Sequence, residues 1–380
     1  MMKNNISDFV ILGGGCSALS FINQVIEKKV TKYSFIIIEK QKKYADDKSW
    51  CFWSENIKKN KNIIEASWSS FSFNLGSKTN FLSSINFKYY YIRSIKFYES
   101  IKKKIINCSH IMLKLNETII SIKNKKNYYE VITNKDVYLA KNVLDTRPNI
   151  NIYKKNPFLY QCFVGYEIKS GEKINLKKSN AYLMHNMHTA NNKFYFEYIL
   201  PIGKSTYLFE LTTFTKKDLS LKIIEKELKI VLSKYFNKPY QIIRKEYGKI
   251  PMGFVNSKLI KNQKNYFVSG SLAGSIRPSS GYAFVDIQKW SEKAANNLKI
   301  KGNLEILEKP EVVKNFLDKI FLKVVSSDIS KAPQIFYTFS KNISPATFIK
   351  FMLGEASLLE YLRIIYAMPK RIFLKCLIKI

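Results

Sequence analysis

The sequence has few of the features that define several common protein classes. Its 380 residues include only five cysteines and no Cys-x-x-Cys pair; they are Cys16, Cys51, Cys108, Cys162 and Cys376. This odd, scattered set favours free thiols in a reducing compartment over a disulfide framework or a zinc site. No stretch approaches the roughly 20 consecutive apolar residues that a membrane-spanning helix requires. The first residues lead into a strand pattern without a signal-peptide hydrophobic segment, so we expect a cytoplasmic protein.

Acidic residues and arginines are also scarce. The chain has 63 Lys and Arg against 29 Asp and Glu, a formal charge of +34, which first suggests a nucleic-acid partner. Only six of these basic residues are Arg, whereas base and phosphate recognition favours the forked guanidinium. Lysines spread along the whole chain indicate a solvated surface, with attraction to anionic lipid as the main alternative. We therefore expect no nucleic-acid partner.

Enough apolar sequence is present to build a sizeable core. Apolar residues make up 46% of the chain and aromatic residues 14%, which excludes a mostly disordered chain. No internal repeat or disordered linker is visible. The length allows one large domain or two of ordinary size.

A nucleotide-binding pattern opens the chain. Residues 8–12 predict a short buried strand, and Gly13, Gly15 and Ala18 then fit G-x-G-x-x-A at the start of a helix. A pyrophosphate would lie at the N-terminus of that helix, where unpaired N–H groups and the dipole favour an anion. A second strand, Tyr33–Ile38, ends at Glu39, where a carboxylate can bind the ribose of FAD or NAD. The alternative is a glycine-rich turn without a ligand.

A second glycine-rich segment, Phe267–Phe284, follows another short apolar strand and precedes a helical pattern over Ala283–Leu298. Two such loops far apart in the sequence indicate one large cofactor that both ends of the chain contact. FAD suits this arrangement better than NAD, because one loop can hold the pyrophosphate and the other the flavin end. An unrelated turn is the alternative.

Six segments, in one order along the chain, resemble the flavoprotein lycopene cyclases that make β-carotene. They are Asp47–Trp53 (DKSWCFW), Tyr91–Tyr98 (YIRSIKFY), Leu144–Pro148 (LDTRP), Gln161–Glu167 (QCFVGYE), Glu246–Met252 (EYGKIPM) and Ala273–Tyr282 (AGSIRPSSGY). Each is short, but together they are specific, and the resemblance covers nearly the whole chain. Three of the six arginines, Arg93, Arg147 and Arg277, fall inside these segments, which indicates positions where the forked guanidinium is needed.

Residues 194–214 predict an aromatic β-hairpin that turns between Pro201 and Ser205. On its second strand Glu210 shares a face with Leu208 and Thr212. A carboxyl group on an apolar face is desolvated and stays protonated, although from the residues alone a solvent-facing glutamate is the more common arrangement. In the resembling family the glutamate at this position is the acid, so the resemblance implies that Glu210 is catalytic. Glu197, on the first strand, is the competing carboxyl group.

The chain departs from the family pattern at two places. Leu183-Met184-His185 stands where the family usually has Leu-Met-Asp, which removes a carboxylate near the expected pocket. The second loop has Ala273-Gly274-Ser275 in place of Ala-Gly-Gly. His185 and His188 lie in a strand-like context without a third ligand, so we expect no metal site.

The resemblance implies a redox-neutral isomerisation of lycopene, or of a similar acyclic carotenoid, to a product with β-rings. It further implies reduced FAD, with NADPH as a transient reductant. The cofactor-binding residues that we expect are Gly13, Gly15, Ala18, Glu39, Arg93, Asp145, Gly270, Gly274, Pro278, Gly281 and Tyr282. Aromatic faces can stabilise the carbocation, and the candidates are Trp53, Tyr195, Phe196, Tyr198 and Phe214.

Three other functions remain open. A flavin monooxygenase of the same fold typically carries Gly-Asp at the start of the second loop, where this chain has Gly270-Ser271. A prenyl-chain reductase would use the flavin for hydride delivery and would not need Glu210. A flavin- or lipid-binding protein without catalysis is the third alternative.

The expected fold is α/β. A doubly wound, FAD-dependent Rossmann-type domain would comprise residues 1–155 and 250–300, with an inserted antiparallel β substrate domain at 156–249. A helical C-terminal region would occupy residues 301–380, and Leu304–Val325 already has helical periodicity. Phe348–Leu353 and Leu358–Ile380 mix apolar and basic residues. They predict either a surface that lies on the inner face of the cell membrane or a helix packed on the protein with its lysines outward.

Overall fold

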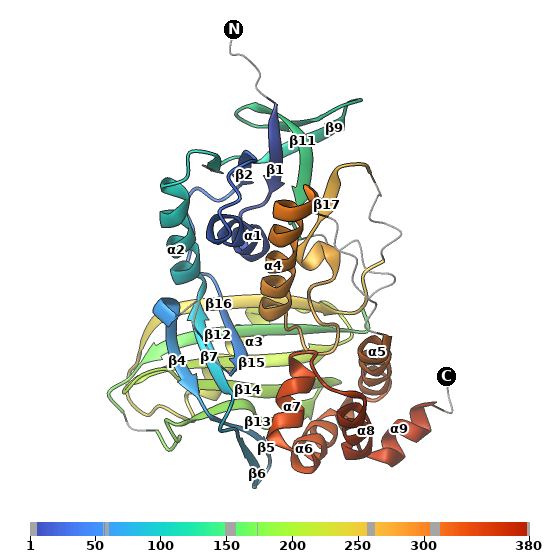
Figure 1. Ribbon diagram of the computed structural model, residues 1–380. Helices are drawn as coiled ribbons and strands as arrows, with labels where there is room; N and C mark the ends of the chain where they lie inside the picture. The colour runs from blue at the N-terminus through green and yellow to red at the C-terminus, as the bar shows by residue number, and fades with distance from the viewer. Residues whose placement is uncertain are drawn as a thin grey trace.

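A computed structural model describes residues 6–55, 57, 61–148, 157–172, 174–256, 263–304 and 312–377. Within these residues the chain forms three β-sheets and a group of C-terminal helices (Figure 1). The expected domain boundary near residue 155 lies outside the described residues, as do residues 305–311 of the predicted helix Leu304–Val325 and residues 378–380 of the tail. The predicted α/β fold with a helical C-terminal region is confirmed.

The first sheet contains the two strands that precede the glycine-rich loops, β1 and β17. Its order is β8-β2-β1-β11-β10-β9, and β17 pairs with β11. The strands β8, β2, β1, β11 and β17 are parallel, and β9, β10 and β11 form an antiparallel meander. The bounds are β1 (Ser7–Leu12), β2 (Phe35–Glu39), β8 (Ile111–Leu115), β9 (Ile119–Asn124), β10 (Tyr129–Thr133), β11 (Val137–Asp145) and β17 (Tyr266–Val268).

Both faces of this sheet are covered, because Phe9–Leu12 of β1 and Phe35–Ile38 of β2 are apolar at every position, as in other parallel sheets. The helices α1 (Cys16–Glu27), α2 (Ser94–Ile106) and α4 (Phe284–Lys301) pack on one face. Side chains of the β9–β11 meander pack against the other face of β1 and β2. The nucleotide-binding end of β1 is therefore buried on both faces.

The second sheet also has seven strands, most of them longer, and is mostly antiparallel, with the order β16-β12-β15-β14-β13-β5-β6. It takes in β5 and β6, which belong to the part of the sequence that we assigned to the nucleotide-binding domain. The domain division itself stays a prediction. The bounds are β5 (Ser70–Leu75), β6 (Lys78–Ser83), β12 (Leu159–Lys169), β13 (Asn180–Ala190), β14 (Lys193–Pro201), β15 (Thr206–Thr215) and β16 (Gln241–Met252).

One face of the second sheet is covered by α3 (Leu221–Leu232). Its buried residues Ile224, Leu228 and Leu232 recur every four positions, so they form one apolar stripe along the helix. This stripe packs on alternate side chains of β12 and β15, among them Tyr166, and forms a separate core. The opposite face of the sheet is thereby left for the C-terminal helices.

The C-terminal helices lie against that opposite face, at the lower right of Figure 1. They are α5 (Val312–Ser327), α6 (Ala332–Asn342), α7 (Pro345–Met352), α8 (Leu358–Ala367) and α9 (Lys370–Leu377). In the parts of the chain that the structure describes, none of the helices has both the length and the hydropathy to cross a bilayer.

A three-stranded sheet connects the two larger ones. It consists of β3 (Ser49–Ser54), β4 (Ile64–Trp68) and β7 (Lys88–Arg93) in the order β3-β7-β4. Alternate residues of β3 point to opposite sides: Trp53 belongs to the core below the second sheet, and Phe52 to the core of the nucleotide-binding helices. The sheet therefore forms part of the wall between the two halves of the molecule.

Candidate active site

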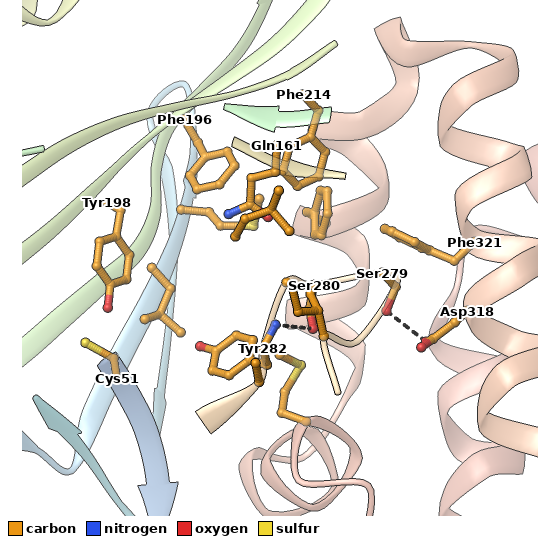
Figure 2. A pocket seen from close by; sticks show the side chains of 18 of the residues that line it. Cys51, Gln161, Phe196, Tyr198, Phe214, Ser279, Ser280, Tyr282, Asp318 and Phe321 are labelled. Carbon is orange, nitrogen blue, oxygen red and sulfur yellow. Dashed lines mark hydrogen bonds between the residues drawn. The ribbon is translucent and has the colours of Figure 1, made fainter. Parts of the chain in front are cut away.

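A cavity of about 1650 Å³ lies between the second sheet and the C-terminal helices (Figure 2). This volume exceeds the ~300–1,000 Å³ of most small-molecule sites. Most of the side chains that line it are aromatic or aliphatic. Figure 2 shows Cys51 and Tyr198 on one side and Phe321 of α5 on the other. The cavity can therefore accept a large apolar molecule.

Glu210 lies in the wall of this cavity, on β15. Its side chain is half-buried, and the exposed part faces the cavity. The Glu210 Oε1 accepts a hydrogen bond of 2.6 Å from the Thr212 hydroxyl. Burial first, and the negative charge of Glu246 second, raise the pKa of Glu210 from 4.5 to about 8, against opposing effects of Thr212 and Arg244. A carboxyl group in this environment holds its proton at neutral pH.

Glu197, the competing carboxyl group, does not line the cavity. It pairs with Leu211 across the hairpin, whereas Glu210 pairs with Tyr198, and neighbouring positions on a strand face opposite sides. Glu197 points toward α3, where it accepts hydrogen bonds from the Tyr235 hydroxyl (2.5 Å) and the Asn186 amide (3.1 Å). Burial raises the pKa of Glu197 as well, but its position separates it from the apolar cavity.

The same alternation corrects one aromatic candidate. Trp53, Phe196, Tyr198 and Phe214 line the cavity as expected. Tyr195 does not: it belongs to the core beneath α3, stacks on His188 at 5.3 Å and donates a hydrogen bond to Glu227. The expectation for Tyr195 was wrong because it treated consecutive residues of one strand as if they shared a face.

His185 also lies away from the cavity. Its ring packs on Tyr182, which belongs to the core beneath α3, and burial lowers the pKa of His185. The carboxylate that the family pattern has at this position would therefore lie on the α3 side of the sheet, so its replacement by His leaves the cavity wall unchanged.

Three tyrosine hydroxyl groups meet at one end of the cavity. The Tyr89 hydroxyl lies 3.0 Å from that of Tyr198 and 2.9 Å from that of Tyr282. The Tyr282 ring stacks on Trp53 with the ring centroids 5.6 Å apart. Tyr282, which we expected to bind the cofactor, is thus part of the cavity wall. Its hydroxyl group and that of Tyr198 come from segments far apart in the sequence.

A buried network of charged groups lies beside Glu210, and Glu246 and Asp46 of this network also line the cavity. Arg244 donates a hydrogen bond of 2.8 Å to Glu246 and one of 3.2 Å to Glu167, and all three side chains are at most 5% exposed. Ser49 donates to Glu246 at 2.9 Å. Arg93 joins the edge of this network through ion pairs with Asp46 and, at longer range, Glu65 and Glu167. The sequence motif at Glu246 and the rarity of arginine were the available signals for this network.

The first glycine loop has the geometry that the sequence predicts. Gly13 has a φ of +89°, and Gly15 precedes α1 without a side-chain cap; a Cβ added at Gly15 would meet no described atom within 4 Å. The first turn of α1 thus keeps its N–H groups for an anion. Ala18 is fully buried. Glu39 accepts hydrogen bonds from the backbone N–H groups of Gly14 (2.7 Å) and Gln41 (2.9 Å).

The second glycine loop meets the first. The hydroxyl groups of Ser17 and Ser269 lie 2.6 Å apart, and a Cβ on Gly270 would come within 3.0 Å of the Ser17 Cβ. Asp145, at the end of β11, lies next to this junction and binds the backbone N–H of Ser269 through its carbonyl oxygen. Both glycine loops and the end of β11 therefore converge on one edge of the first sheet.

The remaining predicted cofactor residues lie farther along the second loop. Gly274 has a φ of +81° and ends a short 3₁₀ turn, near Val255. Pro278 and Gly281 form a tight turn that a hydrogen bond from Gly281 N–H to the Arg277 carbonyl closes at 2.9 Å. Gly281 lines the cavity, whereas Gly274 and Pro278 do not. The loop thus runs from the glycine junction to the apolar cavity.

Two of the arginines in the family-like segments use their forked geometry on carboxylates of this chain. Arg147 binds both carboxylate oxygens of Asp145, at 2.9 and 2.7 Å. Arg277 binds both oxygens of Asp318 on α5, at 3.1 and 3.0 Å, and stands over the ring of Phe351. The Arg277–Asp318 pair ties the second glycine loop to the C-terminal helices.

The far end of the cavity reaches α8 and α9. Leu362, Tyr366 and Leu374 line the cavity and are also 61%, 73% and 57% exposed. Leu358 and Leu359, at the start of α8, are 71% and 68% exposed. Exposed apolar side chains of α8 and α9 therefore form part of the cavity lining, and two more lie at the start of α8.

Solved structures with this fold include several flavoproteins. A geranylgeranyl bacteriochlorophyll reductase-like protein from Thermoplasma acidophilum is 12% identical with a TM-score of 0.62, over 97% of this chain and 98% of its own. A flavoprotein/dehydrogenase from Cytophaga hutchinsonii is 10% identical with a TM-score of 0.61, over 91% and 92%. A p-nitrophenol 4-monooxygenase from Pseudomonas putida is 11% identical with a TM-score of 0.58, over 98% and 97%. The chain thus shares its fold with these three proteins.

The family match is more specific than the likeness in fold. Residues 8–377 match the model of the lycopene cyclase protein family, and the chain belongs to that family of enzymes. The resemblance seen in the sequence is thereby confirmed. No curated protein matches the chain at a significant level.

Proposed function

We propose that the protein is a lycopene β-cyclase, which isomerises the ends of an acyclic carotenoid to β-rings with Glu210 as the acid. The observation that carries this proposal is the position of Glu210, a proton-holding carboxyl group in the wall of a large apolar cavity. The other buried carboxyl group of the hairpin, Glu197, faces α3. Family membership supports the same substrate class.

The reaction begins with transfer of the Glu210 proton to the terminal double bond of lycopene. The carbocation then closes onto the next alkene, and a ring proton returns to the Glu210 carboxylate to give the β-ring, so no proton and no electrons are gained or lost overall. The walls serve this chemistry in two ways. The faces of Trp53, Phe196 and Phe214 can stabilise the cation, and a mostly apolar lining excludes water that would otherwise capture it.

FAD fits the paired glycine loops. Gly15 leaves open space before the uncapped first turn of α1, and Gly270 approaches Ser17 closely enough that a side chain would intrude. Gly13, Gly15 and Ala18 would hold the pyrophosphate, and the second loop would carry the flavin toward the cavity. When bound in its reduced, anionic form, the flavin would supply a fixed negative charge that stabilises the carbocation. We propose NADPH as the transient reductant.

The surface around α8 and α9 fits a lipid bilayer. Lycopene is apolar and partitions into membranes, and the cavity reaches the exposed Leu362 and Tyr366. Lys370 and Arg371 at the start of α9 add positive charge beside these apolar groups, which suits an anionic lipid surface. We propose that this surface rests on the membrane and that substrate enters the cavity from the lipid.

The test is incubation of lycopene in liposomes with the protein, FAD and NADPH under argon. We expect a product of unchanged mass with β-ring absorption. Glu210→Gln should lower the rate by roughly 10²- to 10⁴-fold, the range for removal of a general acid. Glu197→Gln, the matched control on the opposite face of the same hairpin, should retain the activity.

The alternatives give different product masses in the same assay. A product one oxygen atom heavier, formed only in air, would identify a monooxygenase. A product heavier by hydrogen would identify a prenyl-chain reductase. Full activity of Glu210→Gln would refute the assignment of the acid even if lycopene is cyclised.

A further inference from the structure

Four neighbouring strands place a row of residues across the cavity side of the second sheet. The register pairs Tyr198 of β14 with Glu210 of β15, Glu210 with Gly165 of β12, and Gly165 with Glu246 of β16. Directly paired residues share a face of the sheet. Glu210 and Glu246 therefore flank Gly165 on the same face.

Gly165 leaves a gap that Glu246 fills. A Cβ at Gly165 would lie 2.9 Å from the Glu246 Cγ, 3.2 Å from its Oε1 and 3.4 Å from the Glu210 Cβ. The first of these distances is shorter than any ordinary carbon contact. The Glu246 side chain thus leans over the backbone of β12 toward Glu210, and this is possible only because residue 165 has no side chain.

Glu246 is held in this position from two sides. Arg244 donates at 2.8 Å and Ser49 at 2.9 Å to the same oxygen, Oε2. Arg244 also binds Glu167 (3.2 Å) and lies 3.7 Å from Asp46. Because several carboxylates share this one guanidinium, its positive charge does not cancel the negative charge that Glu246 presents to Glu210.

Several titratable groups near Glu210 on other elements are neutral, while the charged side chains that also line the cavity, apart from Glu246 and Asp318, are Asp46, Asp47, Lys48, Lys245, Lys249 and Lys370. Tyr198 comes from β14, Tyr89 from β7, Tyr282 from the segment before α4 and Cys51 from β3, and burial raises the pKa of each. On the helical side of the cavity, Asp318 is neutralised by Arg277. Glu246 and Arg244 are therefore the charged pair closest in register to Glu210.

We infer that Glu246 is a positioning residue for the acid: its Arg244-bound carboxylate, placed across Gly165, keeps Glu210 protonated at neutral pH. This inference rests on the proposed role of Glu210. The raised pKa of Glu210, with Glu246 as its second cause after burial, agrees with the geometry. Arg244 and Ser49 act through Glu246, and Gly165 provides the space.

The test measures the pH at which Glu210 loses its proton. The first readout is the alkaline limb of the cyclisation rate. The second needs no substrate: it is the infrared carbonyl band of a protonated carboxyl group, assigned to Glu210 by its loss in Glu210→Gln. In Glu246→Gln the repulsion is gone, so both readouts should move to lower pH by about one pH unit, in the range that a neighbouring charge produces. Glu246→Asp, which keeps the charge, should restore part of the wild-type value.

Glu167→Gln is the matched control. This variant removes a buried carboxylate that binds the same Arg244, but residue 167 is not paired with Glu210. The alkaline limb of its cyclisation rate should therefore stay at the wild-type pH. Gly165→Ala tests the geometry separately: its Cβ displaces Glu246, and the limb should again move to lower pH. This variant and Glu246→Asp carry the test if Glu246→Gln does not fold.

Two results would overturn the inference. One is an unchanged infrared titration in Glu246→Gln or, in its place, in Gly165→Ala. The other is an equal shift in Glu167→Gln, which would assign the effect to the whole network and not to Glu246. Failure of wild-type protein to cyclise lycopene would instead refute the proposed function, and the infrared titration would still decide the role of Glu246.

Discussion

The buried Arg277–Asp318 pair gives a stability prediction that can be worked from the structure. The two side chains are 2% and 1% exposed, and Asp318 accepts two hydrogen bonds from Arg277 and one of 2.8 Å from Ser279. Asp318→Asn keeps the shape of the side chain but removes its charge. The guanidinium is left with the Phe351 carbonyl and ring, which do not neutralise it. Breaking one side of such a buried pair costs about 3–5 kcal/mol.

Calorimetry on the purified protein measures this loss. Tm should fall by about 2 °C for each kcal/mol of lost stability, because the shift per kcal/mol becomes smaller in long chains. The expected fall in Tm is therefore roughly 6–10 °C. The control is Glu355→Gln, which breaks the Lys289–Glu355 pair. The distance in this pair, 2.7 Å, is shorter than the 3.0 Å between Arg277 and Asp318, but its side chains are 42% and 49% exposed. An exposed pair contributes about 0–1 kcal/mol. Equal losses in the two variants would refute the reasoning that burial sets the cost.

Three further predictions concern the acid, the glycine junction and the C-terminal surface. Because the folded-state pKa of Glu210 lies above its ordinary 4.5, the stability of the wild-type protein should fall as the pH rises from 4.5 to about 8. Denaturant titration should therefore find that Glu210→Gln is more stable than the wild type at pH 9, by up to about 5 kcal/mol. The variant should show no such gain at pH 4. Gly270→Val places a branched side chain at a φ of +69° against Ser17, so the purified protein should lose flavin absorbance, and full retention would contradict the predicted junction. Leu362→Glu should weaken flotation with anionic vesicles roughly tenfold, whereas Ile223→Glu, on α3 across the second sheet, should leave flotation unchanged.

Local patterns in the sequence predicted the elements that short stretches of chain define. The strand, glycine turn and helix at Gly13 depend on adjacent residues only, and the hairpin around Gly203 likewise forms from neighbouring strands. Alternation along β15 was enough to place Glu210 with Leu208 on one face. The same rule, applied to β14, would have excluded Tyr195.

The rest depends on which distant segments come together. Ser49, which donates a hydrogen bond to Glu246, lies 197 residues earlier in the sequence and on a strand of a different sheet. Nothing in the sequence distinguishes Asp318 from the rest of the 29 acidic residues, and only the fold shows that it binds Arg277. No periodicity in the sequence specifies such contacts, because register and helix packing are set by the whole core and not by the segment itself.

The late pairing of β17 with β11 has a consequence for how the chain is made. Tyr266 binds Asp145, 121 residues earlier, and Ser269 meets Ser17, 252 residues earlier. At ~5–20 residues per second, a ribosome needs roughly 6–24 s to add the strand that completes the first sheet once β11 has emerged. Throughout that interval the short edge of β11 at Val143–Asp145, beyond the part that β10 covers, is open for wrong pairing. Nascent chains should therefore depend on chaperones until α4 has packed on α1, long after most of the nucleotide-binding sequence has been synthesised.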